Sequence, residues 1–177
     1  SEDLRRSDIL SRVRLDEISF TGGTLAFRDG RRGETIVLHA VKADVSSPGI
    51  TGPWRLRAHT TYNDRPIDID LNTGAHQQSE PFRFGLTVAS ADGSGFTYAF
   101  DGGTLNGITE GQVRVAPAAA DSGKSDAEGS FRPLAFTAKL KGDFEAIAFD
   151  DIQVSRMEPG ENGAIAKGSA TLRLGSE

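Results

Sequence analysis

The residues best suited to chemistry in this chain are two groups of carboxylates. Asp68 and Asp70 lie two positions apart, and a second group lies later in the chain at Asp143, Glu145, Asp150 and Asp151. Paired carboxylates cleave glycosidic bonds and bind Ca²⁺, but the calcium loop D-x-[DN]-x-[DN]-G is absent. Both groups fall on stretches that alternate like strands, so we expect a solvated face rather than an active site.

The three histidines, His39, His59 and His76, are isolated from one another. None has a second histidine or a carboxylate at i, i+2 or i, i+4 spacing together with the supporting partners that a metal site needs. The G-x-S-x-G turn of a serine hydrolase is missing, and Gly93-Ser94-Gly95 completes no phosphate-binding glycine pattern. We therefore expect no enzymatic activity, no cofactor and no metal site.

Charge and composition restrict the class of partner. The net charge is -5, and the 20 basic residues are scattered among 25 acidic ones, whereas a nucleic-acid surface concentrates positive charge. We expect no nucleic-acid partner. The absence of cysteine excludes disulfides and thiolate metal sites. No stretch approaches 18 apolar residues and the chain starts at Ser1, so we expect a segment of a longer protein, with any anchor or signal upstream of it.

The elements that must position these side chains are antiparallel strands, most clearly within residues 54–74. Apolar and polar residues alternate over 54–62 and again over 67–72, which is typical of strands with one face in water. The turn between them falls on Asn63, Asp64, Arg65 and Pro66. Cross-strand pairing of Arg57 with Asp68 or Asp70 would add about 0.2–1 kcal/mol and help to fix the register.

The same alternation predicts an all-β chain in which about a dozen short strands form a curved antiparallel meander. Its apolar inner face is either an open groove or the inside of a sandwich-like fold. We expect one domain over 1–177, a short helix within 1–14, and a mobile loop over 116–130, where no large apolar side chain occurs. Gly22-Gly23 predicts a hairpin turn, and the change of parity at Asp150-Asp151 predicts a β-bulge or a tight bend.

Aromatic residues recur on one side of the later predicted strands. The stripe comprises Phe82, Phe84, Phe96, Tyr98, Phe100, Phe136, Phe144 and Phe149. Such a stripe is usually the closed core of a domain. In an open sheet it would instead contact lipid acyl chains, and the sequence leaves both interpretations open. The candidate lipid-contact residues are Phe82, Phe84, Leu86, Phe96, Tyr98, Phe100 and Phe136.

Three stretches combine strand and turn patterns: ISFTGGTLAFRDG at 18–30, VKADVSSPGITGPWRLRAHTTYNDRPIDIDLNTG at 41–74, and FEAIAFDDIQVSRMEPGENGAIAKGSATLRLG at 144–175. In these stretches the chain resembles the AsmA-like family of Gram-negative envelope proteins. The shared features are strand and turn patterns rather than catalytic motifs. The resemblance implies a long periplasmic β structure, anchored in the inner membrane, whose strands curl into a hydrophobic groove.

Two functions follow as hypotheses. By the resemblance, the chain is a non-enzymatic periplasmic segment that takes part in outer-membrane biogenesis and in phospholipid transport between the inner and outer membranes. Its partners would be phospholipid acyl chains, neighbouring segments of the same chain, and the membrane through the anchor. The alternative is a β-sandwich binding module in which Trp54, Tyr62 and Tyr98 meet a carbohydrate or a protein partner.

Overall fold

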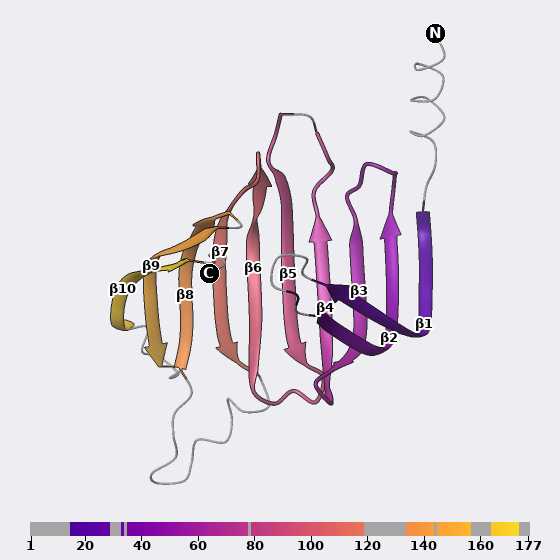
Figure 1. Cartoon of the computed structure of the whole chain (residues 1–177), viewed down its shortest axis with the longest axis horizontal. Helices are drawn as coiled ribbons and strands as arrows, with labels where there is room; N and C mark the ends of the chain where they lie inside the picture. The colour runs from indigo at the N-terminus through magenta and orange to yellow at the C-terminus, as the bar shows by residue number, and fades with distance from the viewer. Residues whose placement is uncertain are drawn as a thin grey trace.

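A computed structural model describes residues 15–28, 33, 35–77, 79–118, 134–143, 145–156 and 164–173 of the chain. Ten strands contain most of these residues (Figure 1). Their bounds are β1 Leu15–Arg28, β2 Thr35–Ser47, β3 Arg55–Tyr62, β4 Arg65–Thr73, β5 Phe82–Ser90, β6 Phe96–Leu105, β7 Ile108–Pro117, β8 Leu134–Gly142, β9 Ala146–Arg156 and β10 Ala164–Arg173. In this described part of the chain, no helix is long and apolar enough to cross a bilayer.

The strands form one antiparallel sheet whose order follows the chain from β1 to β10. Each strand pairs with its neighbours in sequence, and β1 and β10 are the two edges. Among the described residues, no strand contacts any strand other than its neighbours in the sheet. The all-β antiparallel meander expected from the alternating sequence is confirmed.

The structure has ten strands rather than about a dozen, and one predicted break, at Gly22-Gly23, lies inside the longer strand β1. The hairpin predicted at Gly22-Gly23 is wrong: β1 pairs with β2 on both sides of it, with register shifts between Thr21 and Leu25. Gly22 has a φ of 77°, so it supplies the left-handed conformation of an irregularity within the strand instead of a turn. The bulge predicted at Asp150-Asp151 is confirmed within β9 by a register shift.

The central hairpin is confirmed as the pairing of β3 with β4, although its turn is shorter than expected. Tyr62 pairs directly with Arg65, which leaves Asn63 and Asp64 as a two-residue turn. Both have positive φ, 47° and 60°, as a type I′ turn requires. Arg65 and Pro66, predicted in the turn, are the first residues of β4.

The two sides of the sheet differ sharply in composition. One row of directly paired residues crosses all ten strands and is entirely apolar: Phe20, Ala43, Ala58, Ile69, Val88, Tyr98, Val115, Phe136, Val154 and Ala166. The row one residue away is almost entirely polar: Ser19, Asp44, Arg57, Asp70, Thr87, Ala99, Arg114, Thr137, Gln153 and Lys167. Successive residues of a strand point to opposite sides, so these rows define an apolar face and a polar face.

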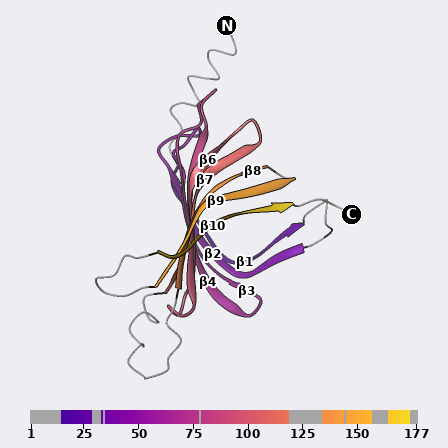
Figure 2. The same ribbon diagram turned by 90° about the vertical axis from the view of Figure 1, so that its left-hand side faces the viewer.

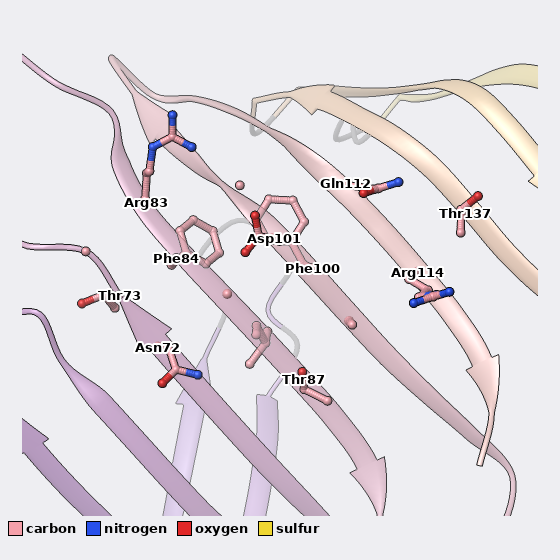
Figure 3. Close-up of a pocket in the computed structure, with 15 residues that line it drawn as sticks. Asn72, Thr73, Arg83, Phe84, Thr87, Phe100, Asp101, Gln112, Arg114 and Thr137 are labelled. Carbon is pink, nitrogen blue, oxygen red and sulfur yellow. The ribbon is translucent and has the colours of Figure 1, made fainter. Parts of the chain in front are cut away.

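The sheet is bent, and its outer strands curve toward one side (Figure 2). In Figure 1 the bent parts of β1 and β2 pass in front of β3 and β4, so the concave side faces the viewer. Figure 3 views the sheet from the side opposite to that in Figure 1, because β5 and β7 still run downward while the left-to-right order of the strands is reversed. This opposite, convex side is the one that carries polar-face residues such as Arg83, Thr87 and Arg114. The apolar face is therefore the concave one.

No second layer covers the concave side within the described residues. In the whole described part of the chain only three hydrophobic residues are buried, and all are small: Ala43, Ala118 and Ala138. Phe20, Leu25 and Phe27 are 55%, 58% and 65% exposed. The stripe of aromatic residues is thus part of an open face rather than the core of a closed sandwich.

Three predictions concern residues that lie partly or wholly outside the described part. The helix expected within 1–14 lies outside it, as does Phe144 of the aromatic stripe. Of the loop expected over 116–130, residues 119–130 lie outside it. Ala116 and Pro117 belong to β7, so the strand continues farther than the sequence indicated.

Candidate functional site

All seven candidate lipid-contact residues lie on the apolar face. Phe82, Phe84 and Leu86 come from β5, Phe96, Tyr98 and Phe100 from β6, and Phe136 from β8. The register confirms that they share one side, since Leu86 pairs with Phe100 and Val115 of β7 pairs with both Tyr98 and Phe136. Strands β5 to β8 therefore bring together residues that are up to 54 positions apart in the sequence.

Three phenylalanine rings form the centre of this region. The ring centroids of Phe84 and Phe100 are 4.9 Å apart, and those of Phe82 and Phe84 are 6.5 Å apart. His76, in the connection before β5, places its ring edge-on to Phe82 at 6.2 Å. These separations lie within the range of favourable aromatic pairs. The rings extend from the β4–β5 connection toward the middle of the sheet.

The Phe100 ring lies over two glycines of the paired strands β6 and β7. A Cβ atom at Gly102 or at Gly111 would stand 2.7 Å or 2.6 Å from Phe100 Cζ. Neither position can carry a side chain while the ring stays there, because real Cβ atoms do not approach other atoms so closely. The pair Gly102–Gly111 thus lets a large aromatic side chain lie close to the sheet and keeps the concave surface low at this point.

The apolar face extends beyond the predicted residues to both edges of the sheet. Phe20, Leu25 and Phe27 of β1 and Leu172 of β10 are exposed. They are not among the predicted contacts, although alternation of the same kind occurs over 18–27. Tyr98 is 54% exposed near the middle of the face, so access is not confined to the edges.

Charged residues are almost excluded from the apolar face. From β2 to β9, the charged side chains with the parity of this face are Arg65 and Arg156, which pair with Tyr62 and Leu134. Arg65 begins β4 and Arg156 ends β9, so in a meander both lie at the same edge of the sheet. The concave surface is apolar between its edges, with positive charge at one of them.

The polar face of β3 and β4 carries a ladder of cross-strand contacts. Arg57 Nε donates to Asp70 Oδ2 at 3.3 Å, which confirms one of the two pairings expected for Arg57. Asp68 pairs instead with His59, whose Nδ1 lies 2.8 Å from Asp68 Oδ1. All four side chains are more than a third exposed, so these contacts help to fix register and contribute little stability.

In the later acidic group, Asp143 and Asp151 form local hydrogen bonds and an ion pair. Asp143 Oδ1 accepts the backbone N–H groups of Glu145 and Ala146 at 2.8 Å and 3.0 Å, and these hydrogen bonds lower the pKa of its carboxyl. Lys139 Nζ lies 2.6 Å from Asp151 Oδ2. That hydrogen bond lowers the pKa of Asp151 and raises the pKa of Lys139. Across the described residues, no group of three or more histidine, aspartate or glutamate side chains is arranged to hold a metal ion.

No protein-family model matches the chain, and no curated protein or solved structure matches it.

Proposed function

We propose that the chain is a non-enzymatic segment of an AsmA-like envelope protein and that its concave face holds phospholipid acyl chains. In this role it contributes to phospholipid transport between the inner and outer membranes and so to outer-membrane biogenesis. The rest of the protein would supply the inner-membrane anchor and the neighbouring periplasmic segments. The observation that carries the proposal is the unbroken apolar row from Phe20 to Ala166, which no layer covers within the described residues.

The size of the apolar face favours an extended ligand. Strands about 4.8 Å apart and about 3.3 Å per residue make a ten-stranded sheet with nine-residue strands about 43 Å by 30 Å. The resulting face, about 1,300 Å², exceeds the patches of about 300–600 Å² that are typical of soluble monomers. Each methylene buried there contributes about 0.8 kcal/mol. An acyl chain is a long row of methylenes, which matches a long apolar surface better than a compact ligand does.

The distribution of charge favours an amphipathic ligand with an anionic headgroup. Arg65 and Arg156 lie at one edge of the apolar face, at the end where β3 meets β4 and β9 ends. A phosphate can accept hydrogen bonds from arginine while its acyl chains lie on the apolar surface between the edges. A purely hydrocarbon ligand would have no use for these two cations.

The first experiment is mass spectrometry of an organic extract of the chain, purified without detergent. We expect phospholipid in a fixed ratio to protein, and an unrelated all-β domain from the same host should carry none. If the extract is empty, the protein is next incubated with phospholipid vesicles, re-isolated and extracted again. An empty extract after that step would contradict the proposal.

A matched pair of substitutions separates the two faces. Val154 lies in the apolar row and Gln153, its neighbour in β9, lies in the polar row. We expect Val154→Asp to reduce bound phospholipid at least about tenfold, because a charge on the apolar face costs more than 1.4 kcal/mol, and Gln153→Asp to leave it unchanged. Phe84→Asp and Leu86→Asp should act like Val154→Asp, while Arg55→Ala should not. Equal losses from substitutions on both faces would contradict the acyl-chain groove and favour a surface that binds a protein.

A further inference from the structure

The polar face contains a hollow of about 530 Å³ that no motif along the chain predicts (Figure 3). Five adjacent strands, β4 to β8, line it. Its floor is low because Gly85 and Ala99 point to this side and have almost no side chain, while Arg83, Gln112 and Arg114 stand around them. The volume is within the range of about 300–1,000 Å³ that is usual for ligand sites.

The charged side chains of the hollow are not paired with one another. Arg83, Asp101 and Arg114 make no side-chain hydrogen bond or ion pair within the described part of the chain. Elsewhere on the polar face, cross-strand charges do pair, as in Arg57 with Asp70 and Lys141 with Glu110. Arg83, Asp101 and Arg114 all line the hollow, where a ligand would have access to them.

The strand register fixes the relative positions of Arg83, Asp101 and Arg114, and so the spacing of the ligand groups that they can bind. Arg83 lies opposite Gly103 of β6, and Arg114 lies opposite Ala99 on the other side of the same strand. Two strand spacings and four residues along the strand separate their Cα atoms by about 16 Å. Asp101 lies midway between them, and Figure 3 shows it between the two arginines. The hollow therefore presents cation, anion and cation along a diagonal of the sheet.

The remaining lining favours a ligand rich in hydroxyl groups. Thr87, Gln112 and Thr137 contribute hydroxyl and amide groups, which both donate and accept hydrogen bonds. Aromatic stacking, which a nucleobase would use, is not offered, because Phe84 and Phe100 have the parity of the apolar face. Arginine binds carboxylates and phosphates through paired N–H groups. Asp101 can accept hydrogen bonds from hydroxyls between the two acid-binding positions.

We propose that this hollow binds an anionic saccharide, a sugar unit or short chain that carries a carboxylate or phosphate. The site lies on the opposite face of the sheet from the acyl-chain groove and does not depend on it. Arg83 and Arg114 hold the acid groups, while Asp101, Gln112 and the two threonines contact hydroxyls. The shared chemistry covers sugar acids and sugar phosphates, and the probes of the experiment distinguish between them.

The test is an NMR titration in which the backbone amide chemical shifts of the ¹⁵N-labelled full chain report binding. The probes are glucuronate and glucose 6-phosphate. The controls are glucose, which is the sugar half alone, and inorganic phosphate, which is the acid half alone. We expect saturable shifts at Gly85 and its neighbours with at least one anionic sugar, at an affinity about tenfold higher than for either half. Equal affinity for inorganic phosphate would mean an anion site only, and no saturable shift with either anionic sugar would overturn the proposal.

Substitutions test whether the anionic sugar binds in the hollow. Arg114→Gln should weaken binding of the anionic sugar about tenfold, and Gly85→Val should abolish it by filling the floor. The sheet should tolerate that change, since a Cβ at Gly85 would meet the flexible Asp101 carboxylate at 3.4 Å and Phe100 O at 3.8 Å, both ordinary contact distances. Arg57→Gln, on the same face outside the hollow, is the control and should bind normally. Undiminished binding by Gly85→Val, with a native amide spectrum, would overturn the site.

Discussion

Asp92 shows how a single exposed carboxylate organises a turn of this sheet. Its Oδ1 accepts hydrogen bonds from the hydroxyls of Ser94 and Ser90, both at 2.7 Å, and from the backbone N–H of Ser94 at 2.9 Å. Each of these bonds favours the ionised form, and together they lower the pKa of Asp92 to about 2. The charge of Asp92 therefore holds the connection between β5 and β6.

The folded-state pKa of Asp92 is lower than the ordinary value of 3.8, so ionisation favours the folded chain. This contribution is complete above pH 3.8 and is lost as the pH falls from 3.8 to about 2. We expect an NMR titration of the side-chain carboxyl carbon to give a midpoint near pH 2 for Asp92. In Ser94→Ala the midpoint should move upward, because the hydroxyl that lowers the pKa most is removed. An unchanged midpoint would contradict this account.

The contact between Phe100 and Gly111 leads to a prediction about stability. A Cβ at Gly111 would lie 2.4 Å from Asp101 O and 2.8 Å from Gly102 Cα, which are backbone atoms that cannot move aside alone. We expect Gly111→Ala to lower the free energy of unfolding by about 1–3 kcal/mol, the usual cost of overpacking, as measured by urea denaturation. The control is Gly168→Ala in β10, where nothing lies within 4 Å of the added Cβ. A similar loss in both variants would show that crowding around the added Cβ at Gly111 is not responsible.

At the scale of elements, the sequence predicted pairing well where local pattern and long-range register agree. In β3 and β4 the alternation, the turn residues and the cross-strand charges all indicate one hairpin, and the structure has it. Gly22-Gly23 shows the limit, because a glycine with positive φ fits a hairpin turn and a strand irregularity equally well. Only the pairing of residues on both sides with β2 decides between them, and that pairing is not encoded locally.

The turn of the central hairpin permits a direct test of this local encoding. Asp64 has a φ of 60°, a conformation that costs a non-glycine residue up to about 1–2 kcal/mol and glycine very little. We therefore expect Asp64→Gly to raise the free energy of unfolding by about 1 kcal/mol, measured by urea denaturation. Asp64→Val should lower it, since a β-branched residue tolerates positive φ poorly. A stabilising valine would contradict the turn.

For the whole molecule, the sequence predicted which side chains share a face but not whether that face is covered. Alternation puts Phe84, Leu86 and Phe100 on one side in either a closed sandwich or an open sheet. The difference depends on whether a second layer exists, and that is a property of the complete arrangement of strands. The polar hollow was missed for a similar reason, because Gly85, Asp101 and Arg114 lie on three strands and form no motif along the chain.

An open apolar face makes the stability of the whole molecule depend on what covers it. A ligand that binds only the folded chain stabilises it by about 1.4 kcal/mol at ten times its dissociation constant. For a chain of 177 residues this raises the melting temperature by about 3–6 °C. We expect this rise with dihexanoyl phosphatidylcholine below its micelle concentration, measured by circular dichroism.

Phosphocholine is the matched control for this ligand, because it carries the same headgroup without acyl chains. It should leave the melting temperature unchanged, and Phe84→Asp should lose the response to the lipid.

The lipid-free chain should also bind an apolar fluorescent dye while keeping its β-sheet spectrum, since Phe20, Phe27 and Tyr98 are more than half exposed. An equal rise with phosphocholine would assign the effect to the headgroup, and the apolar face would then not be the surface that binds the lipid.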